Sequence, residues 1–171
     1  ILGMQIDRQS DGTIKLTQRT YLMDILKRYL EGYNEVSDSN GEPDVDKCVG
    51  EWSLSKLPNS PIDPRDPAGA IHMAKTPAEI AEMEKYDMRG QVGALMYLCR
   101  FTRTDCLFAV SVLSRYQGRP SLKHHLCAQR IMKYLLKTRD KGLIFYPKSQ
   151  NQYAPKLIGF ADASNGIHVD N

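Results

Sequence analysis

Three residues between Tyr86 and Tyr116 have the types and the spacing of a contact surface for nucleic acid. Arg89, Gly93 and Tyr97 are four residues apart, so they lie on one face of a predicted helix. A cation suits a phosphate or a base edge, and an aromatic ring suits a sugar or a base face. A glycine inside a helix costs about 1 kcal/mol relative to alanine, which suggests that something approaches the backbone at Gly93. Either a neighbouring helix or a nucleic-acid groove would explain it.

A second candidate for chemistry is Asp162. It follows Leu157-Ile158-Gly159-Phe160-Ala161, an apolar run typical of a buried strand. A carboxylate at the end of a strand can hold a divalent cation, but two-metal hydrolysis needs several carboxylates. We expect the other acids of such a site to be absent from these 171 residues.

The cysteines and histidines predict no chemistry. Cys48, Cys99, Cys106 and Cys127 lack the paired short spacing of a zinc ribbon, so we expect reduced thiols. A metal cluster of Cys99, Cys106, His124 and Cys127 is not expected, because Cys99 falls on the apolar face of its helix. We expect His124 and His125 to be capping or surface residues.

Short motifs along the chain point to one family. In order, they are Ile1-Leu2-Gly3-Met4-Gln5-Ile6, Arg89-x-x-Val92-Gly93-x-Leu95-x-Tyr97-Leu98, Thr102-Arg103-x-Asp105, Ser114-Arg115, Pro120-x-x-x-His124, Arg130-Ile131-x-Lys133-Tyr134-Leu135-x-x-Thr138 and Gly159-Phe160-Ala161-Asp162-Ala163. Together they resemble the Pol polyprotein of copia-type LTR retrotransposons, between the reverse transcriptase palm and RNase H. The match covers nearly the whole chain and is interrupted mainly by residues 34 to 75.

The resemblance implies a fragment of an RNA-directed DNA polymerase with RNase H that grips the template-primer duplex. Its implied nucleic-acid-binding residues are Leu2, Gly3, Met4 and Gln5 in a primer-grip hairpin, and Arg89, Gly93 and Tyr97 in the thumb. Asp162 would be the first catalytic RNase H carboxylate and would hold Mg²⁺ only in the intact enzyme, so no cofactor is expected for this chain alone. The implied partners are an RNA/DNA hybrid, a DNA duplex and the rest of the Pol polyprotein.

Two departures from the family pattern affect these expectations. Thr104 stands where the family usually has proline, which weakens the turn but keeps Arg103 and Asp105, expected to form a structural ion pair. Ser164 and Asn165 replace the family's usual Asp-Trp after the RNase H motif. We expect neither the polymerase nor the RNase H active site to be complete.

Composition and charge set the outer limits. The chain is 42% hydrophobic and 25% charged, which is ordinary for a globular protein. It has no apolar run near the roughly 20 residues of a membrane span, so we expect no membrane contact and an intracellular location, in a cytoplasmic particle or the nucleus.

The net charge of +3 conceals an asymmetry along the chain, since residues 87 to 147 carry +8 and residues 31 to 86 carry −7. The basic segment fits a phosphate-backbone footprint or solvated helix surfaces.

The predicted fold class is α+β, with a β-hairpin, a small helical thumb and connection bundle, and the first strand of an incomplete RNase H-like α/β sheet. Residues 1–33 would form the hairpin and the first thumb helix, capped by Thr17 or Thr20. Residues 34–75 would be an acidic, Pro-rich strap, 76–141 the basic helices, 142–156 a connection strand and tether, and 157–171 the start of RNase H. Residues expected to face inward include Phe108, Leu122 and Leu126.

Two other functions stay open. The helices could be a protein-interaction module whose basic face meets an acidic partner. The chain could also be a non-functional relic of a retroelement. Preference for an RNA/DNA hybrid would separate the polymerase fragment from the interaction module, and an intact reading frame in the flanking DNA would argue against a relic.

Overall fold

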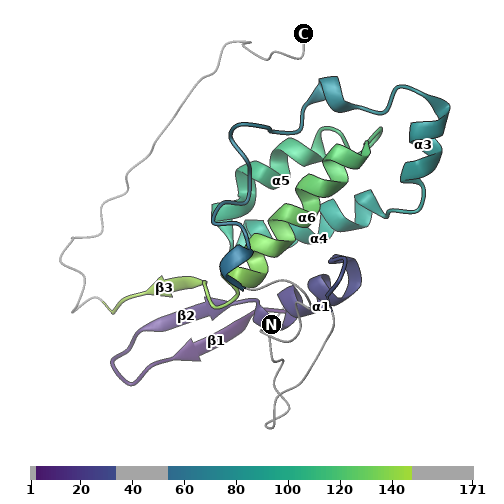
Figure 1. The fold of residues 1–171 in the computed structure, drawn as a ribbon. Coiled ribbons are helices and arrows are strands. Elements are labelled where there is room, and N and C mark those ends of the chain that lie inside the picture. Colours follow the sequence, from purple (N-terminus) through teal and green to yellow (C-terminus); the bar gives the residue numbers. More distant parts are fainter. Residues whose placement is uncertain (1–2, 34–53, 148–171) are drawn as a thin grey trace.

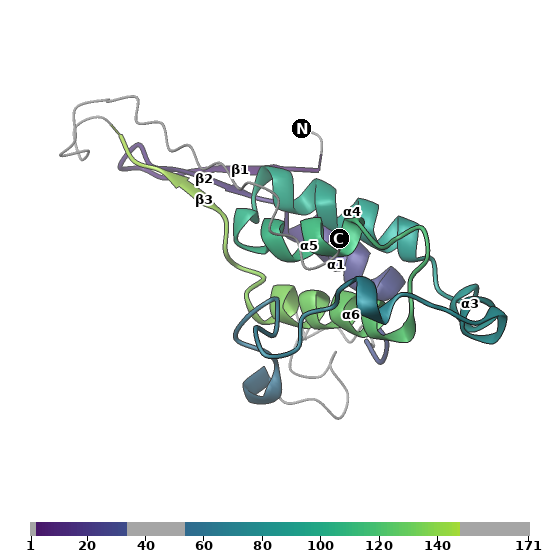
Figure 2. The ribbon, with the colours of Figure 1, turned by 90° about the horizontal axis from the view of Figure 1, so that it is seen from above.

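The computed structural model describes residues 3–33 and 54–147 and shows a three-stranded antiparallel sheet joined to a helical bundle. The expected α+β content is confirmed, whereas the thumb and RNase H assignments stay predictions. Figures 1 and 2 show the sheet projecting from one end of the bundle, with helix α3 at the opposite end. Leu2, Asp162 and the expected RNase H strand lie outside the described residues, as do the first half of the strap and the tether.

The sheet begins with the predicted hairpin, formed by β1 (Gln5–Arg8) and β2 (Ile14–Thr17). Its turn is closed by Asp11, whose carboxylate accepts hydrogen bonds from the backbone N and the hydroxyl of Thr13, at 2.8 and 3.0 Å. Gly12 has a φ of +86°, which an L side chain rarely adopts. The third strand, β3 (Leu143–Phe145), pairs with β2, so the sheet joins both ends of the described chain.

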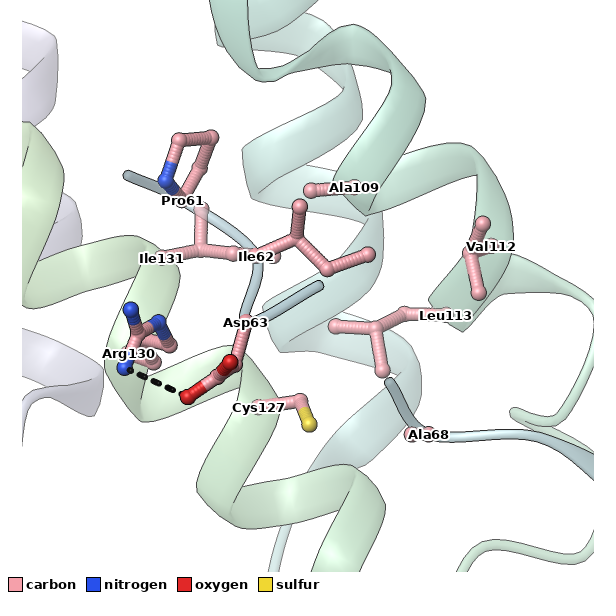
Figure 3. Close-up of a pocket in the computed structure, with 10 residues that line it drawn as sticks. All are labelled: Pro61, Ile62, Asp63, Ala68, Ala109, Val112, Leu113, Cys127, Arg130 and Ile131. Atoms are coloured by element: carbon pink, nitrogen blue, oxygen red, sulfur yellow. Dashed lines mark ion pairs between the residues drawn. The ribbon is translucent and has the colours of Figure 1, made fainter. Parts of the chain in front are cut away.

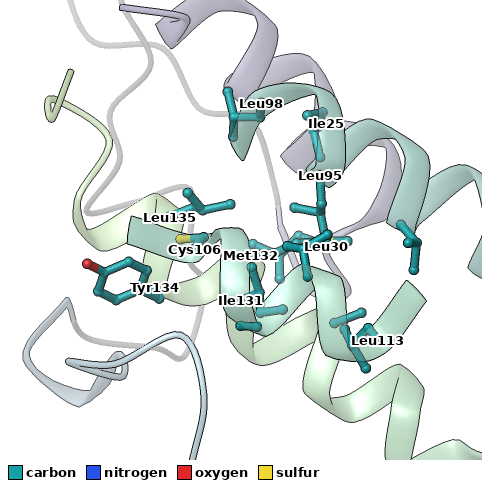
Figure 4. Close-up of a cluster of buried hydrophobic side chains, with 14 of the residues drawn as sticks. Ile25, Leu30, Leu95, Leu98, Cys106, Leu113, Ile131, Met132, Tyr134 and Leu135 are labelled. Atoms are coloured by element: carbon teal, nitrogen blue, oxygen red, sulfur yellow. The ribbon is translucent and has the colours of Figure 1, made fainter. Parts of the chain in front are cut away.

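Four helices form the bundle: α1 (Arg19–Tyr29), α4 (Met88–Phe101), α5 (Leu107–Ser114) and α6 (Leu122–Lys137). Their inward faces make the core shown in Figure 4, where Leu95, Leu98 and Leu135 are fully buried. Each fully buried leucine of this kind contributes about 1.5 to 3 kcal/mol relative to an exposed one. The core therefore fixes the orientation of α4 and leaves its opposite side outward.

The start of α1 corrects one prediction. Its N-cap is Gln18 with no capping side chain, so neither Thr17 nor Thr20 caps this helix. Instead, the side-chain oxygen of Gln5 on β1 accepts a hydrogen bond from the backbone N of Arg19 at 3.0 Å. The hairpin thus satisfies a helix donor that a local cap would otherwise satisfy.

Helix α3 (Pro77–Met83) begins with a capping box. Thr76 accepts a hydrogen bond from the backbone N of Glu79 at 3.2 Å, and the Glu79 carboxylate accepts one from the backbone N of Thr76 at 3.0 Å. These bonds lower the pKa of the Glu79 carboxyl.

The described half of the strap runs along the bundle from the 3-10 turn η1 (Leu54–Lys56) to η2 (Ala70–His72). Three of its apolar side chains are buried, and these belong to Leu57, Ala68 and Ala74. Leu57 belongs to the core cluster and so anchors the strap to the bundle. The strap is therefore part of the packed structure where it is described.

Three inward predictions are wrong. Phe108 is 71% exposed, and Leu122 and Leu126 are 41% and 53% exposed. In α5 the buried residues are Ala109, Val110 and Leu113 instead. Within the described residues, no helix combines the length and the apolar character needed to cross a membrane.

Helix α6 starts with a histidine in a capping role, as predicted for His124. Its Nδ1 accepts a hydrogen bond from the backbone N of Ser121 at 3.1 Å, and its side chain is buried rather than exposed. Burial, with a smaller contribution from His72, lowers the pKa of His124 below its ordinary value. The folded protein therefore holds this imidazole neutral.

Stability should fall as the pH drops below about 6.5, the ordinary pKa of histidine. The unfolded chain binds a proton at His124 more readily than the folded chain does, so protonation favours unfolding. The variant His124→Gln should show a shallower loss between pH 7 and pH 5.5, because glutamine at this position keeps the capping bond without titrating. Urea unfolding across this pH range measures the difference. Parallel slopes for the two proteins would contradict the assignment.

Candidate nucleic-acid interface

Helix α4 is positioned by its cap and by its buried side. The Asp87 carboxylate accepts a hydrogen bond from the backbone N of Gly90 at 2.8 Å, which starts the helix one residue before Arg89. Val92, Leu95 and Cys99 are buried against the bundle. The opposite side carries what we call the α4 stripe, made of Arg89, Gly93, Tyr97 and Arg100.

Gly93 lies open on this stripe. A Cβ built on it would meet no atom within 4 Å, and the residue is exposed. The neighbouring helix proposed as one explanation for this glycine is therefore not present among the described residues. The backbone at this point is accessible to a partner from outside.

Tyr97 is held in place by two other rings. Tyr21 of α1 meets it edge to face, with ring centroids 5.1 Å apart, and Phe101 lies tilted at 4.9 Å. The Tyr21 hydroxyl donates to the backbone oxygen of Ala94 at 3.5 Å, and burial together with Tyr97 and Tyr29 raises its pKa. Tyr97 is half-buried, so its ring is fixed by its neighbours but still reaches the surface.

The predicted hairpin residues approach the same place from the sheet. Gly3 has a φ of +71° and lies against Tyr21, since a Cβ there would be 3.7 Å from the Tyr21 Cβ. The Gln5 side chain is occupied within the protein, because it bonds Thr20 as well as Arg19. Gly3 and Tyr97 thus both lie against Tyr21, and Gln5 has a structural role.

Most basic side chains outside the α4 stripe are engaged within the protein. On α6, Lys123 pairs with Asp66 of the strap, and Lys137 donates to Leu57 and Asn59 at 3.0 and 2.7 Å. Figure 3 shows a small, mostly apolar pocket between the strap, α5 and α6, with an ion pair between Arg130 and Asp63 at 3.8 Å. Two carboxylates of the strap therefore pair with two cations of α6, and a third cation, Lys137, is bonded to neutral groups of the strap.

The ion pair predicted between Arg103 and Asp105 is confirmed as structural. The guanidinium donates to both carboxylate oxygens, at 3.0 and 2.9 Å, and only 3% of its side chain is exposed. Burial opposes the charge of Arg103, but the bonds from Asp105 outweigh it and raise the pKa. Arg103 is therefore unavailable to a ligand.

Arg100 is the residue that the sequence reasoning missed. It is exposed, and its side chain has no ion pair, hydrogen bond or ring contact to any described residue. The available signal was its distance of eleven residues from Arg89, which completes about three helical turns. A search by steps of four from Arg89 finds Tyr97 and Phe101 and passes over Arg100.

Metal chemistry has no candidate in the described part of the chain. No three histidine, cysteine or acidic side chains within residues 3–33 and 54–147 could together hold a metal ion. Cys99, Cys106 and Cys127 are free thiols, and burial raises the pKa of Cys127. The predicted metal residue Asp162 lies outside the described residues.

Comparisons with curated proteins confirm the resemblance seen in the motifs. Over 172 aligned positions, covering the whole chain, the sequence is 30% identical to the retrovirus-related Pol polyprotein from transposon TNT 1-94 of Nicotiana tabacum. It is 27% identical over 98% of the chain to the putative transposon Ty5-1 protein of Saccharomyces cerevisiae. It is also 39% identical over 42% of the chain to secreted RxLR effector protein 161 of Plasmopara viticola.

The chain spans only part of each relative, namely 11% of the tobacco polyprotein, 44% of the yeast protein and 48% of the effector protein. No protein-family model and no solved structure matches the chain.

Proposed function

We propose that this chain, which is similar over its whole length to a Pol polyprotein of the copia-type retrotransposons, is a segment of an RNA-directed DNA polymerase that grips the template-primer duplex. The single observation that carries the proposal is the α4 stripe. A free cation, an open stretch of backbone and a supported aromatic ring follow one another along one helix face. A cation can contact a phosphate, an open backbone can approach a groove, and an aromatic ring can pack on a sugar.

The α4 stripe would act in the minor groove. Arg89 would contact a phosphate, and Gly93 would let the helix backbone approach the groove because no side chain intervenes. The Tyr97 ring would lie against a sugar. None of these contacts distinguishes bases, so the grip would be independent of sequence, as a polymerase needs.

The sheet would contribute the primer side. Gly3 and Met4 lie just before the first strand of the hairpin, Gly3 against Tyr21, and would approach the primer together with Leu2. In the intact polyprotein, Asp162 would join further carboxylates in holding Mg²⁺, which would supply the hydrolytic chemistry of RNase H. The partners of this segment would be an RNA/DNA hybrid, a DNA duplex and the remainder of the polyprotein.

The double variant Arg89→Ala, Tyr97→Ala should bind a 20-base-pair RNA/DNA hybrid roughly tenfold to a hundredfold more weakly than the parent chain, since loss of one aromatic contact alone costs about 1 to 3 kcal/mol. Fluorescence anisotropy at fixed salt measures this affinity. Circular dichroism on the same samples shows whether the variant is folded.

Arg65→Ala is the matched control. Arg65 is exposed on the strap, and its side chain has no partner among the described residues, so its loss removes the same charge elsewhere. Equal affinities for the double variant and the control, in folded samples, would refute the grip. Weaker binding of the double variant alone would support it.

A second candidate follows from the similarity to an effector protein. The helical bundle could bind another protein, and the exposed Phe108 on α5 is a side chain of the type that anchors such interfaces. This function predicts no preference for an RNA/DNA hybrid and no effect of Arg89 or Tyr97 on hybrid binding. The experiment above therefore separates the two candidates.

A further inference from the structure

Two arginines stand apart from the other basic residues between positions 88 and 141. The side chains of Arg103, Arg119, Lys123 and Lys137 donate hydrogen bonds to described partners, and Arg130 forms an ion pair with Asp63. Arg139 lies 4.0 Å from Asp140, and Lys141 lies over the Tyr134 ring. Arg115 and Lys133 also have interactions. Of the basic residues between positions 88 and 141, only Arg89 and Arg100 have a side chain without a partner among residues 3–33 and 54–147, and both are exposed.

These two arginines share one face of one helix. They are eleven residues apart on α4, which places them about 16 Å apart along the axis and within about 20° of the same direction. Between them lie Gly93, with no atom within 4 Å of a built Cβ, and the supported ring of Tyr97. The α4 stripe therefore has a cation without a partner at each end, and an open stretch of backbone and a tyrosine ring between the two.

We propose that Arg89 and Arg100 form a two-arginine clamp that contacts phosphates on opposite strands of a duplex, across its minor groove. This inference rests on the proposed function and deepens it by naming the kind of duplex. A spacing of about 16 Å suits the wide, shallow minor groove of an A-like duplex, such as an RNA/DNA hybrid. The minor groove of B-form DNA is only about 6 Å wide and fits this spacing less well.

Arg100 also lies in the last turn of α4, where a cation interacts favourably with the helix dipole. That role would affect stability without affecting how the affinity for nucleic acid depends on salt. The salt dependence of binding therefore separates a phosphate contact from a structural role.

The first test compares Arg89→Gln, Arg100→Gln and the double variant in the full 171-residue chain on a 20-base-pair RNA/DNA hybrid. Log affinity falls as log salt rises. Each single variant should make this slope shallower by about one, and the double variant should make it shallower by about two. Arg65→Gln should leave the slope unchanged. An unchanged slope for folded Arg100→Gln would overturn the clamp.

The second test assigns the strands. In a hybrid whose DNA strand carries uncharged methylphosphonate linkages, the arginine that contacts the DNA strand has already lost its phosphate. One of the two single variants should then bind this hybrid as tightly as the parent chain, whereas the other should still bind more weakly. If both variants match the parent, or both remain weaker, the arginines do not divide between the strands and the clamp is wrong.

The two proposals fail in different ways. If the parent chain binds no duplex, both fall. If it binds the hybrid and depends on Arg89 and Tyr97 but not on Arg100, the grip stands and the clamp alone falls. A dependence on both arginines, with stronger binding to the hybrid than to B-form DNA, supports both.

Discussion

Replacement of Arg103 by alanine is expected to lower the free energy of unfolding by about 3 kcal/mol. The buried guanidinium joins three parts of the bundle, since it lies between α4 and α5, pairs with Asp105, and donates to the backbone oxygen of Thr138 at 3.1 Å. Removal of the arginine leaves the Asp105 charge without its main partner. The expected loss is at the lower end for a broken buried pair because the Asp105 side chain is 35% exposed.

The control for this prediction is Arg100→Ala, three residues earlier and exposed. It should change the free energy of unfolding by no more than about 0.5 kcal/mol. Arg103→Lys should fall between the two, because lysine keeps the charge but cannot bond both carboxylate oxygens in parallel. Urea unfolding monitored by circular dichroism measures all three, and equal midpoints for the two alanine variants would show that the pair is not a structural link.

The contribution of the Arg103–Asp105 pair to stability should also depend on pH. Burial raises the pKa of the Asp105 carboxyl, but the bonds from Arg103 and Tyr134 outweigh it and hold the pKa below its ordinary value. A carboxyl of this kind stabilises the fold above its ordinary pKa and loses that contribution as the pH falls toward its folded pKa. The difference between the parent chain and Arg103→Ala should therefore shrink under strongly acidic conditions.

Local signals in the sequence predicted the parts of the fold that depend on neighbours in the chain. The predicted hairpin turns at Asp11 and Gly12, and the first of the predicted basic helices begins with the capping box of Thr76 and Glu79, so both depend only on nearby atoms. The start of α1 failed for the opposite reason. Its first donor is satisfied by Gln5 from the adjacent strand, a contact that no local pattern contains.

The inward face of α5 could not be chosen from periodicity. Nearly every residue from Leu107 to Leu113 is apolar, so the pattern has no polar side to mark the surface. Packing between α4 and α6 selects Ala109, Val110 and Leu113, and Phe108 is left outside. On α6, likewise, Ile131, Met132 and Leu135 pack inward, whereas Leu122 and Leu126 stay exposed.

The candidate site was predicted only in part. The four-residue spacing of Arg89, Gly93 and Tyr97 placed them on one face, but the sequence could not show whether Gly93 faced another helix or open space. Nor could charge alone distinguish the α6 cations that pair with the strap from Arg89 and Arg100, whose side chains have no partner among the described residues. That distinction depends on contacts between segments more than 50 residues apart in sequence, such as Asp66 with Lys123.

Substitutions of Gly93 are expected to affect stability and hybrid binding in opposite directions. Gly93→Ala should raise the free energy of unfolding by about 0.5 to 1 kcal/mol, because alanine is the better helix former and its Cβ meets no atom within 4 Å. Gly93→Leu should also fold, yet it should bind the RNA/DNA hybrid at least about tenfold more weakly, a loss of about 1.4 kcal/mol. The leucine side chain would occupy the space through which the helix backbone meets the groove.

Gly69→Leu provides the control, since Gly69 lies on the strap in an extended conformation and a Cβ there also meets no atom within 4 Å. It should leave hybrid binding unchanged. Thermal unfolding and fluorescence anisotropy on the same four proteins test both halves of the prediction. If Gly93→Leu binds the hybrid as tightly as Gly69→Leu, the backbone of α4 does not approach the duplex. A glycine that costs stability at an open helix position would then need an explanation other than nucleic acid.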